Sequence, residues 1–136
     1  MTTEGVTMRF MSLIRSEEPN PAGSPPPELF AAVGELAQEL SVSGALVDMG
    51  GLLPSSAGAI VSLVDGRISA VDGPFTEAKE LIGGYAVLEV RSREEAIELS
   101  RRMLRLHQVH WPGWQGSCEL RQIEDADHPH PDLPRA

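Results

Sequence analysis

The sequence of 136 residues contains a single cysteine, Cys118, and no long hydrophobic run. One cysteine excludes an intrachain disulfide and any zinc site built from cysteine pairs. No apolar stretch approaches the ~20 residues that span a bilayer. The apolar stretch between Arg9 and Arg15 is also too short for the core of a signal peptide. We therefore expect a cytoplasmic protein that has no membrane partner.

Basic residues are scarce, with 11 Lys and Arg against 20 Asp and Glu and a net charge of −9. A chain this acidic repels phosphate backbones, so we expect no direct nucleic-acid binding. Glycine-rich nucleotide-binding patterns and the Gly-x-Ser-x-Gly elbow of hydrolases are both missing from the sequence. We therefore expect no bound cofactor.

Hydrophobic residues make up 41% of the chain and charged residues 23%, which is typical of a soluble globular protein. Eight of the eleven prolines lie in two segments, residues 16–27 and 125–136. Proline cannot donate to a β-ladder, so these segments are expected to be irregular. The sequence predicts one domain over residues 1–124 with a proline-rich loop at 16–27, followed by a flexible C-terminal tail at 125–136.

Hydrophobic periodicity predicts the regular elements of this domain. Residues 28–42 have the apolar spacing of an amphipathic helix, and Ser92 with Glu95 forms a capping box that opens a second helix. A short helix is expected from Thr76 to Leu81. Strands are predicted at residues 8–14, 45–53, 59–64, 67–71, 84–90 and 117–124, and Asp65-Gly66 joins two of them as a hairpin.

This order of elements predicts an α+β fold of the ferredoxin-like kind, a mostly antiparallel sheet with two main helices on one face. The other face of such a sheet has no helix of its own to cover it. Apolar side chains at Val61, Leu63, Val87 and Leu88 suggest that both faces are hydrophobic. We therefore expect the chain to pair with itself, as a homodimer packed sheet to sheet.

Four segments carry a family resemblance: Met8–Met11 (MRFM), Gly50–Ser55 (GGLLPS), Asp72–Gly84 (DGPFTEAKELIGG) and Glu119–Ile123 (ELRQI). With these segments the sequence resembles the YCII-related family, in the branch named for its Asp-Gly-Pro-Phe motif. The resemblance implies a ferredoxin-like fold that dimerises as an α+β barrel. It implies no assigned activity, although members of the branch are often encoded beside extracytoplasmic-function sigma factors.

Short YCII proteins have a histidine–aspartate pair in a pocket beside the sheet. If that pair transfers, the resemblance makes Asp72 the carboxylate. The predicted helix at residues 28–42 contains no histidine, which departs from the short YCII pattern. Read from the residues alone, Asp72 is a turn residue that bonds to the backbone two positions further on.

Histidines at the end of the second helix are the remaining candidates for acid/base chemistry. His107 and His110 are three residues apart, which places both on one helical face if the helix continues that far. Two histidines with Asp72 or a water could ligate a divalent metal, but no established ligand set is present and we predict no metal site. Alternatively, His107 caps the helix and His110 packs on an indole. His128 and His130 lie in the tail and are expected to be solvated.

Five further residues are candidates for contacting a ligand. Trp111 and Trp114 form a Trp-Pro-Gly-Trp turn that could cover a pocket or the dimer seam. Phe75 anchors the Asp-Gly-Pro-Phe turn, and Tyr85 directly follows Gly84 at the end of the same segment. Arg121 on the last strand could pair with Glu119 or bind a ligand carboxylate.

Three functions remain open. The first is small-molecule binding near the Asp-Gly-Pro-Phe turn, with acid/base chemistry by Asp72 and a helix-end histidine. The second is a regulatory interaction module associated with a sigma factor. The third is a stable dimer that binds no ligand.

Overall fold

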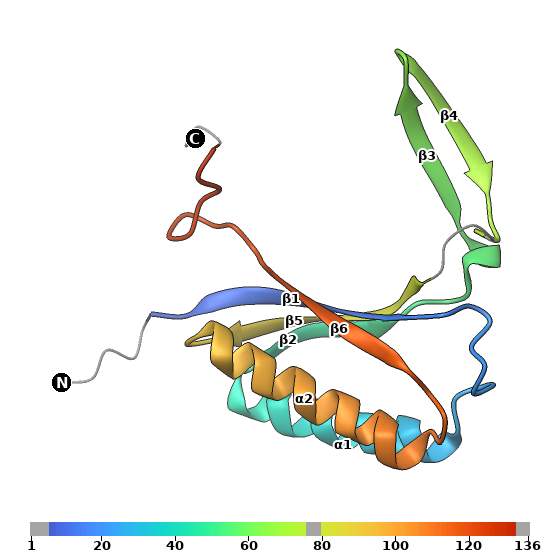
Figure 1. Cartoon of the computed structure of the whole chain (residues 1–136). Helices are drawn as coiled ribbons and strands as arrows, with labels where there is room; N and C mark the ends of the chain where they lie inside the picture. The colour runs from blue at the N-terminus through green and yellow to red at the C-terminus, as the bar shows by residue number, and fades with distance from the viewer. Residues whose placement is uncertain (1–5, 76–79, 133–136) are drawn as a thin grey trace.

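The structure is a computed structural model that describes residues 6–75 and 80–132. Its main body consists of strand β1 (Met8–Ser16), helix α1 (Pro27–Ser43), strand β2 (Leu46–Gly51), strand β5 (Leu81–Val90), helix α2 (Arg93–His110) and strand β6 (Gly116–Gln122). The four strands form an antiparallel sheet in the order β2-β5-β1-β6. Both helices cover one face of that sheet (Figure 1). The predicted α+β, ferredoxin-like architecture is confirmed.

The two helices begin and end where the sequence signals indicate. Helix α1 stops at Gly44, which has a φ of 85°, a conformation that glycine adopts without strain. At the start of α2, Ser92 Oγ accepts a hydrogen bond from Glu95 N over 3.1 Å, as the predicted capping box requires. Within the described part of the chain, neither helix is long and apolar enough to cross a membrane.

The predicted hairpin forms, but it lies outside the main sheet. Strands β3 (Ala59–Val64) and β4 (Arg67–Asp72) make a separate two-stranded sheet that projects away from the body (Figure 1). Between β2 and β3 the chain passes through Pro54 and a 3₁₀ turn, η1 (Ser55–Ala57). Val61 and Leu63 belong to this hairpin. The expectation that they lie in the main sheet was wrong, because β3 and β4 form a separate two-stranded sheet.

The Asp-Gly-Pro-Phe turn fixes the base of this hairpin to η1. Gly73 N donates to Gly58 O over 2.9 Å, and Phe75 N donates to Ser55 Oγ over 3.0 Å. A Cβ on Gly73 would lie 1.7 Å from Ser55 O, so only glycine fits there. Thr76, where a short helix was expected to begin, lies outside the described residues. Leu81, where that helix was expected to end, is the first residue of β5.

The hydrophobic core lies between the sheet and α2, toward the beginning of β1. Phe10, Leu88, Val90 and Ala96 are buried there. On the opposite face of the sheet, neither of the described helices covers Met11, Leu13 and Val87, which are half-buried. Because the inner face alone can pack against the helices, the outer face keeps an apolar band that the fold itself leaves uncovered.

The C-terminal tail is described as far as residue 132. Asp125 Oδ1 accepts hydrogen bonds from the backbone N–H groups of Asp127 and His128, over 2.9 and 2.8 Å. This is a local turn, and the His128 ring lies 3.3 Å from the same carboxylate. The predicted flexibility of residues 125–136 stays a prediction.

We predict that Gly73→Ala destabilises the protein, because the new methyl group overlaps the Ser55 backbone. Overpacking of this kind costs about 1–3 kcal/mol of unfolding free energy, measurable by urea denaturation. Gly83→Ala is the matched control, since a Cβ there meets nothing within 4 Å. Equal unfolding midpoints for the two variants would contradict this role of the turn.

Candidate functional site

A cavity of about 730 Å³ lies between the sheet and the two helices, beyond the hydrophobic core. It forms because the inner face of the sheet carries small residues at that end. Ser12 of β1 lies opposite Ala86 of β5, and Ile14 lies opposite Gly84. On β2, Gly51 also lies opposite Gly84. These positions leave a space that the helices above do not fill, of a size typical of small-molecule pockets.

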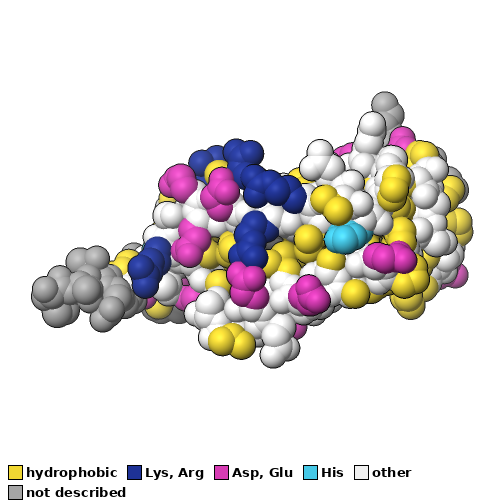
Figure 2. All heavy atoms as spheres, turned by 90° about the horizontal axis from the view of Figure 1, so that it is seen from below, with side chains coloured by type: hydrophobic (Ala, Val, Ile, Leu, Met, Phe, Trp, Pro, Cys, Tyr) yellow, Lys and Arg dark blue, Asp and Glu magenta, His cyan; other side chains and the backbone are white. Residues whose placement is uncertain are grey.

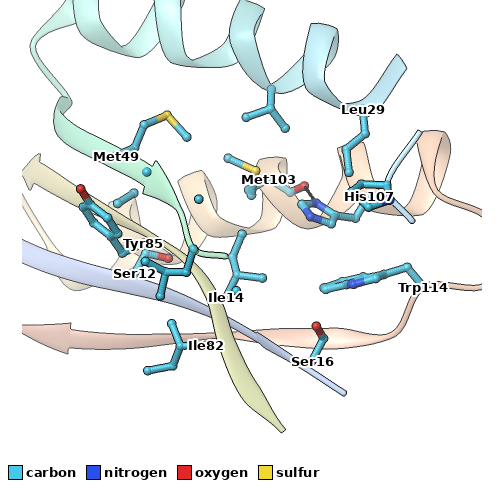
Figure 3. Close-up of a pocket in the computed structure, with 18 of the residues that line it drawn as sticks. Ser12, Ile14, Ser16, Leu29, Met49, Ile82, Tyr85, Met103, His107 and Trp114 are labelled. Carbon is cyan, nitrogen blue, oxygen red and sulfur yellow. Dashed lines mark hydrogen bonds between the residues drawn. The ribbon is translucent and has the colours of Figure 1, made fainter. Parts of the chain in front are cut away.

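The walls of the cavity are mainly apolar. Helix α1 contributes one wall, β2 and β5 contribute another, and α2 closes the far side. Figure 3 shows His107 and Trp114 at one end of the cavity and Met49 with Tyr85 at the other. The apolar residues of the helical walls are Leu29, Phe30, Val33, Leu36, Ala37, Leu40, Leu99 and Met103.

His107 is the buried ionisable side chain of this cavity, with 6% of its surface exposed. Its Nδ1 lies 2.9 Å from Met103 O, one turn earlier in α2 (Figure 3). A carbonyl oxygen only accepts, so Nδ1 carries the proton and Nε2 carries the lone pair. Among the described residues Nε2 has no hydrogen-bond partner, so it is a free acceptor at the end of the cavity.

Burial keeps the His107 ring neutral. Desolvation lowers the pKa of His107 below its ordinary value, and the hydrogen bond to Met103 O opposes this effect only in part. At neutral pH the side chain is therefore a base and a hydrogen-bond acceptor. An uncharged imidazole in apolar surroundings is suited to accept a proton or a hydroxyl hydrogen bond from a bound molecule.

The Trp-Pro-Gly-Trp turn packs against His107. The Trp114 and His107 ring centroids are 4.5 Å apart, and the Trp111 ring lies 6.2 Å from His107 and 6.0 Å from Trp114. Trp111 Nε1 donates to Ala22 O over 3.3 Å, which fixes the proline-rich loop to the end of α2. A Cβ on Gly116 would lie 2.4 Å from the Trp114 ring, so this glycine lets the indole fold over the sheet.

Two serines form the polar part of the cavity floor. Ser12 Oγ and Ser100 Oγ are 3.2 Å apart, and both side chains are buried. Cys118 lies on β6 next to this pair. Burial raises the pKa of the Cys118 thiol, although a hydrogen bond with Ser12 works in the other direction. A protonated thiol is unreactive, which agrees with the expected inert core cysteine.

A short hydrogen-bonded chain connects the cavity mouth to the Asp-Gly-Pro-Phe turn. The Glu18 carboxylate, which lines the mouth, accepts from Ser55 N over 2.7 Å and also from Ser55 Oγ. Ser55 Oγ in turn accepts from Phe75 N. The motif therefore positions the cavity rim through Ser55 and Glu18, while its own side chains stay outside the lining.

The structure brings together some of the predicted site residues. His107, Trp111, Trp114 and Tyr85 line the cavity, and the Tyr85 hydroxyl lies 3.5 Å from Asp48 Oδ2.

The other predicted residues lie elsewhere. Asp72 is exposed at the end of β4, and Phe75 packs in the turn beside Gly58 and Gly73. Arg121 is exposed and lies 3.3 Å from Glu119 Oε2. The proposed partnership of Asp72 with a histidine stays a prediction.

His107 and His110 face different spaces although α2 extends through both. His110 lines the groove between the two helices, together with Glu35, Glu39 and Arg102. Within residues 6–75 and 80–132, no group of three or more His, Cys, Asp or Glu side chains could hold a metal ion. The expectation that the two imidazoles act on one face is not supported by this arrangement.

Sequence reasoning missed Ser12, Ser100, Met103 and Glu18 as parts of the site. Ser100 and Met103 are ordinary helix residues whose role depends on which helical face meets the sheet. The sequence did contain a signal for the floor of the cavity. Ser12 and the glycine pairs at 50–51 and 83–84 are small residues within otherwise apolar strands. Small residues in strands mark places where a sheet leaves room.

We predict that His107 makes stability fall as the solution is acidified. Its pKa is lower in the folded protein than in the unfolded chain, so the unfolded chain binds the proton first. The His107 contribution is therefore intact above the ordinary histidine pKa of about 6.5 and decreases below it, toward the folded pKa. Urea unfolding at about pH 7.5 and about pH 5.5 should show a larger loss for wild type than for His107→Gln. Equal losses in the two proteins would contradict a buried neutral imidazole.

The family model of the YCII-related domain matches residues 8–105, which is more than half of the chain and runs from β1 into α2. A comparison with curated proteins finds no match. The matched region contains most of the residues that line the cavity, His107 and the two tryptophans excepted. By this match the chain belongs to the YCII-related family.

Proposed function

We propose that this protein, as a member of the Asp-Gly-Pro-Phe branch, binds a small organic molecule in the cavity between its helices and its sheet. The observation that carries the proposal is the free Nε2 of His107, a neutral acceptor at the end of an otherwise apolar cavity. Asn20 also lines the cavity, and its buried Nδ2 has no hydrogen-bond partner among the described residues, although buried polar groups are normally satisfied by a partner. A bound molecule with a suitable polar group would supply that partner.

The rim of the cavity supports the same function. Phe30 and Leu53 line it and are 63% and 78% exposed. Apolar side chains around an apolar cavity favour the entry of an apolar molecule, because the whole path removes hydrocarbon surface from water. The Asp-Gly-Pro-Phe turn serves this site by positioning Glu18 through Ser55.

His107 is the proposed acid/base group of any reaction in the cavity. Its Nδ1–H is held by Met103 O, so a proton taken up at Nε2 would leave an imidazolium whose other N–H is already bonded. The sequence had assigned this chemistry to Asp72 together with either His107 or His110. His107→Gln and His110→Gln separate the two histidines, because only the first removes a group from the cavity.

We predict that filling the cavity abolishes ligand binding. Ala37 lines the cavity and Ala31 is exposed on the same helix, so Ala37→Phe and Ala31→Phe make a matched pair. The two tryptophans of the chain both lie at the cavity, so their fluorescence reports occupancy directly. With a panel of neutral bicyclic and tricyclic aromatic compounds, wild type and Ala31→Phe should show saturable fluorescence changes with thermal stabilisation, and Ala37→Phe should show neither. Saturable binding that survives in Ala37→Phe would place the site elsewhere.

We also propose that the protein works as a homodimer that covers two apolar surfaces of each chain. One surface is the band on the outer face of the sheet that contains Met11, Leu13 and Val87. It lies between the ion pairs Arg9–Glu89 and Arg15–Glu119, which are 2.7 and 2.9 Å long. The outer sides of the helices, by contrast, carry many charged side chains (Figure 2). The sheet face is therefore the better candidate for a symmetric interface.

The second surface is the hairpin. Val61, Leu63, Ile68 and Ala70 share one of its faces, because Val61 pairs with Ala70 and Leu63 with Ile68. Leu63 and Ile68 are 69% and 76% exposed. An isolated two-stranded hairpin is only marginally stable in water, so a partner should stabilise it. A second copy is the favoured partner, since the same chain already offers the uncovered sheet band.

We predict that Leu63→Glu converts a dimer into a monomer, because the interface would have to bury a carboxylate without a cation. Val42→Glu is the matched control, since Val42 is 80% exposed on α1, away from both surfaces. Light scattering coupled to size exclusion should find dimers for wild type and Val42→Glu. Met11→Glu tests the sheet band in the same way. A wild-type protein that is monomeric would leave the hairpin free for another protein and favour the interaction-module function.

A further inference from the structure

We propose that the cavity selects uncharged aromatic compounds that carry a hydroxyl group, and rejects carboxylates of the same shape. This inference rests on the proposed function, because it names the class of ligand taken by the same cavity. It follows from the charges around the cavity, the hydrogen bond of His107 to Met103 O and the uncharged donors that line the cavity.

The first observation is the missing positive charge. Among the described residues that line the cavity there is no arginine or lysine, and the charged residues at its rim are Glu17 and Glu18. Lys79, the single lysine of the sequence, lies outside the described residues. An anion that enters this space loses its hydration and approaches two carboxylates, which is unfavourable on both counts.

Three arginines adjoin lining residues in sequence, and each binds a carboxylate outside the cavity. One of them, Arg101, is exposed on α2 and lies 3.1 Å from Glu98. Arg15 lies on the outer face of the sheet, 2.9 Å from Glu119. Arg102 lies between the helices, where its two guanidinium NH₂ groups bond to Glu39 over 2.7 and 2.8 Å. None of the three can serve as a clamp for a ligand carboxylate without giving up its present partner. Arg121, the predicted carboxylate ligand, also lies outside the cavity lining, 3.3 Å from Glu119.

The second observation is that the His107 imidazole offers a ligand an acceptor and not a donor. His107 Nδ1 donates to Met103 O, so the atom left for a ligand is the lone pair of Nε2. A lone pair attracts a hydroxyl hydrogen and repels a carboxylate oxygen. The Trp114 ring, 4.5 Å from the imidazole, provides a flat apolar surface for the aromatic part of the same molecule.

The third observation concerns the donors that remain. Ser12 and Ser100 have two hydroxyl protons between them, and one is used in their mutual hydrogen bond. Asn20 also lines the cavity, and its buried Nδ2 has no hydrogen-bond partner among the described residues. These donors are all uncharged, and without a cation they replace the hydration of a carboxylate poorly, because a carboxylate binds several water molecules. They are enough for an ether or carbonyl oxygen, so they add to the preference for an uncharged molecule.

Isothermal titration of the full-length protein at about pH 7 with three compounds of nearly equal shape tests this proposal. 2-Naphthol is neutral and donates a hydrogen bond, 2-naphthoate is an anion, and naphthalene has no polar group. We expect 2-naphthol to bind most tightly, naphthalene to bind about tenfold more weakly for want of one hydrogen bond, and 2-naphthoate to bind most weakly of the three.

Variants locate the contact. His107→Leu should weaken 2-naphthol by about tenfold and leave naphthalene nearly unchanged, because only the hydroxyl compound uses the acceptor. His107→Gln restores an acceptor and should recover part of the loss. The wild-type comparison needs no variant, so the test stands even if His107→Leu folds poorly.

The outcomes separate the two proposals. Binding of 2-naphthoate as tightly as 2-naphthol overturns the selectivity and leaves the proposed function intact. Binding of none of the three compounds to wild type contradicts the proposed function as well. Equal effects of His107→Leu on 2-naphthol and naphthalene would show that His107 shapes the cavity without accepting a hydrogen bond, which also overturns the proposal.

Discussion

The cavity exists because the inner face of the sheet changes from large to small side chains part of the way along β1. Phe10 packs in the core with Leu88, and Ser12, two residues later, lies opposite Ala86 of β5. Helices resting on such a sheet cannot close onto it without losing the contacts they make at the large residues. The empty volume, the exposed rim and the buried polar groups at the far end all follow from that one change in side-chain size.

The Asp-Gly-Pro-Phe motif has a structural explanation in this chain. Gly73 has no room for a side chain beside Ser55, and the backbone of Phe75 donates to the Ser55 hydroxyl. Ser55 in turn donates a hydrogen bond from its backbone N–H to the Glu18 carboxylate at the mouth of the cavity. The motif thus links the projecting hairpin to the rim of the cavity.

Local signals predicted much of the fold, since helix α1 with its cap at Gly44, the capping box at Ser92 and the Asp65-Gly66 turn all depend on neighbours in sequence. The position of the hairpin could not be predicted in this way, because its strands pair equally well inside or outside the main sheet. The site was predicted least well. His107 was identified by its residue type, but its partners Met103 and Trp114 matter only through the way α2 and the following turn fold against the sheet.

The most direct test of the central claim is the protonation state of His107 itself, measured by ¹⁵N NMR of the imidazole nitrogens at about pH 7. A free acceptor in the cavity requires a neutral ring with the proton on Nδ1 and none on Nε2, and the Nε2 resonance should move when a hydroxyl-bearing compound is added. A proton on Nε2, or a doubly protonated ring, would contradict the geometry on which the proposed ligand site depends.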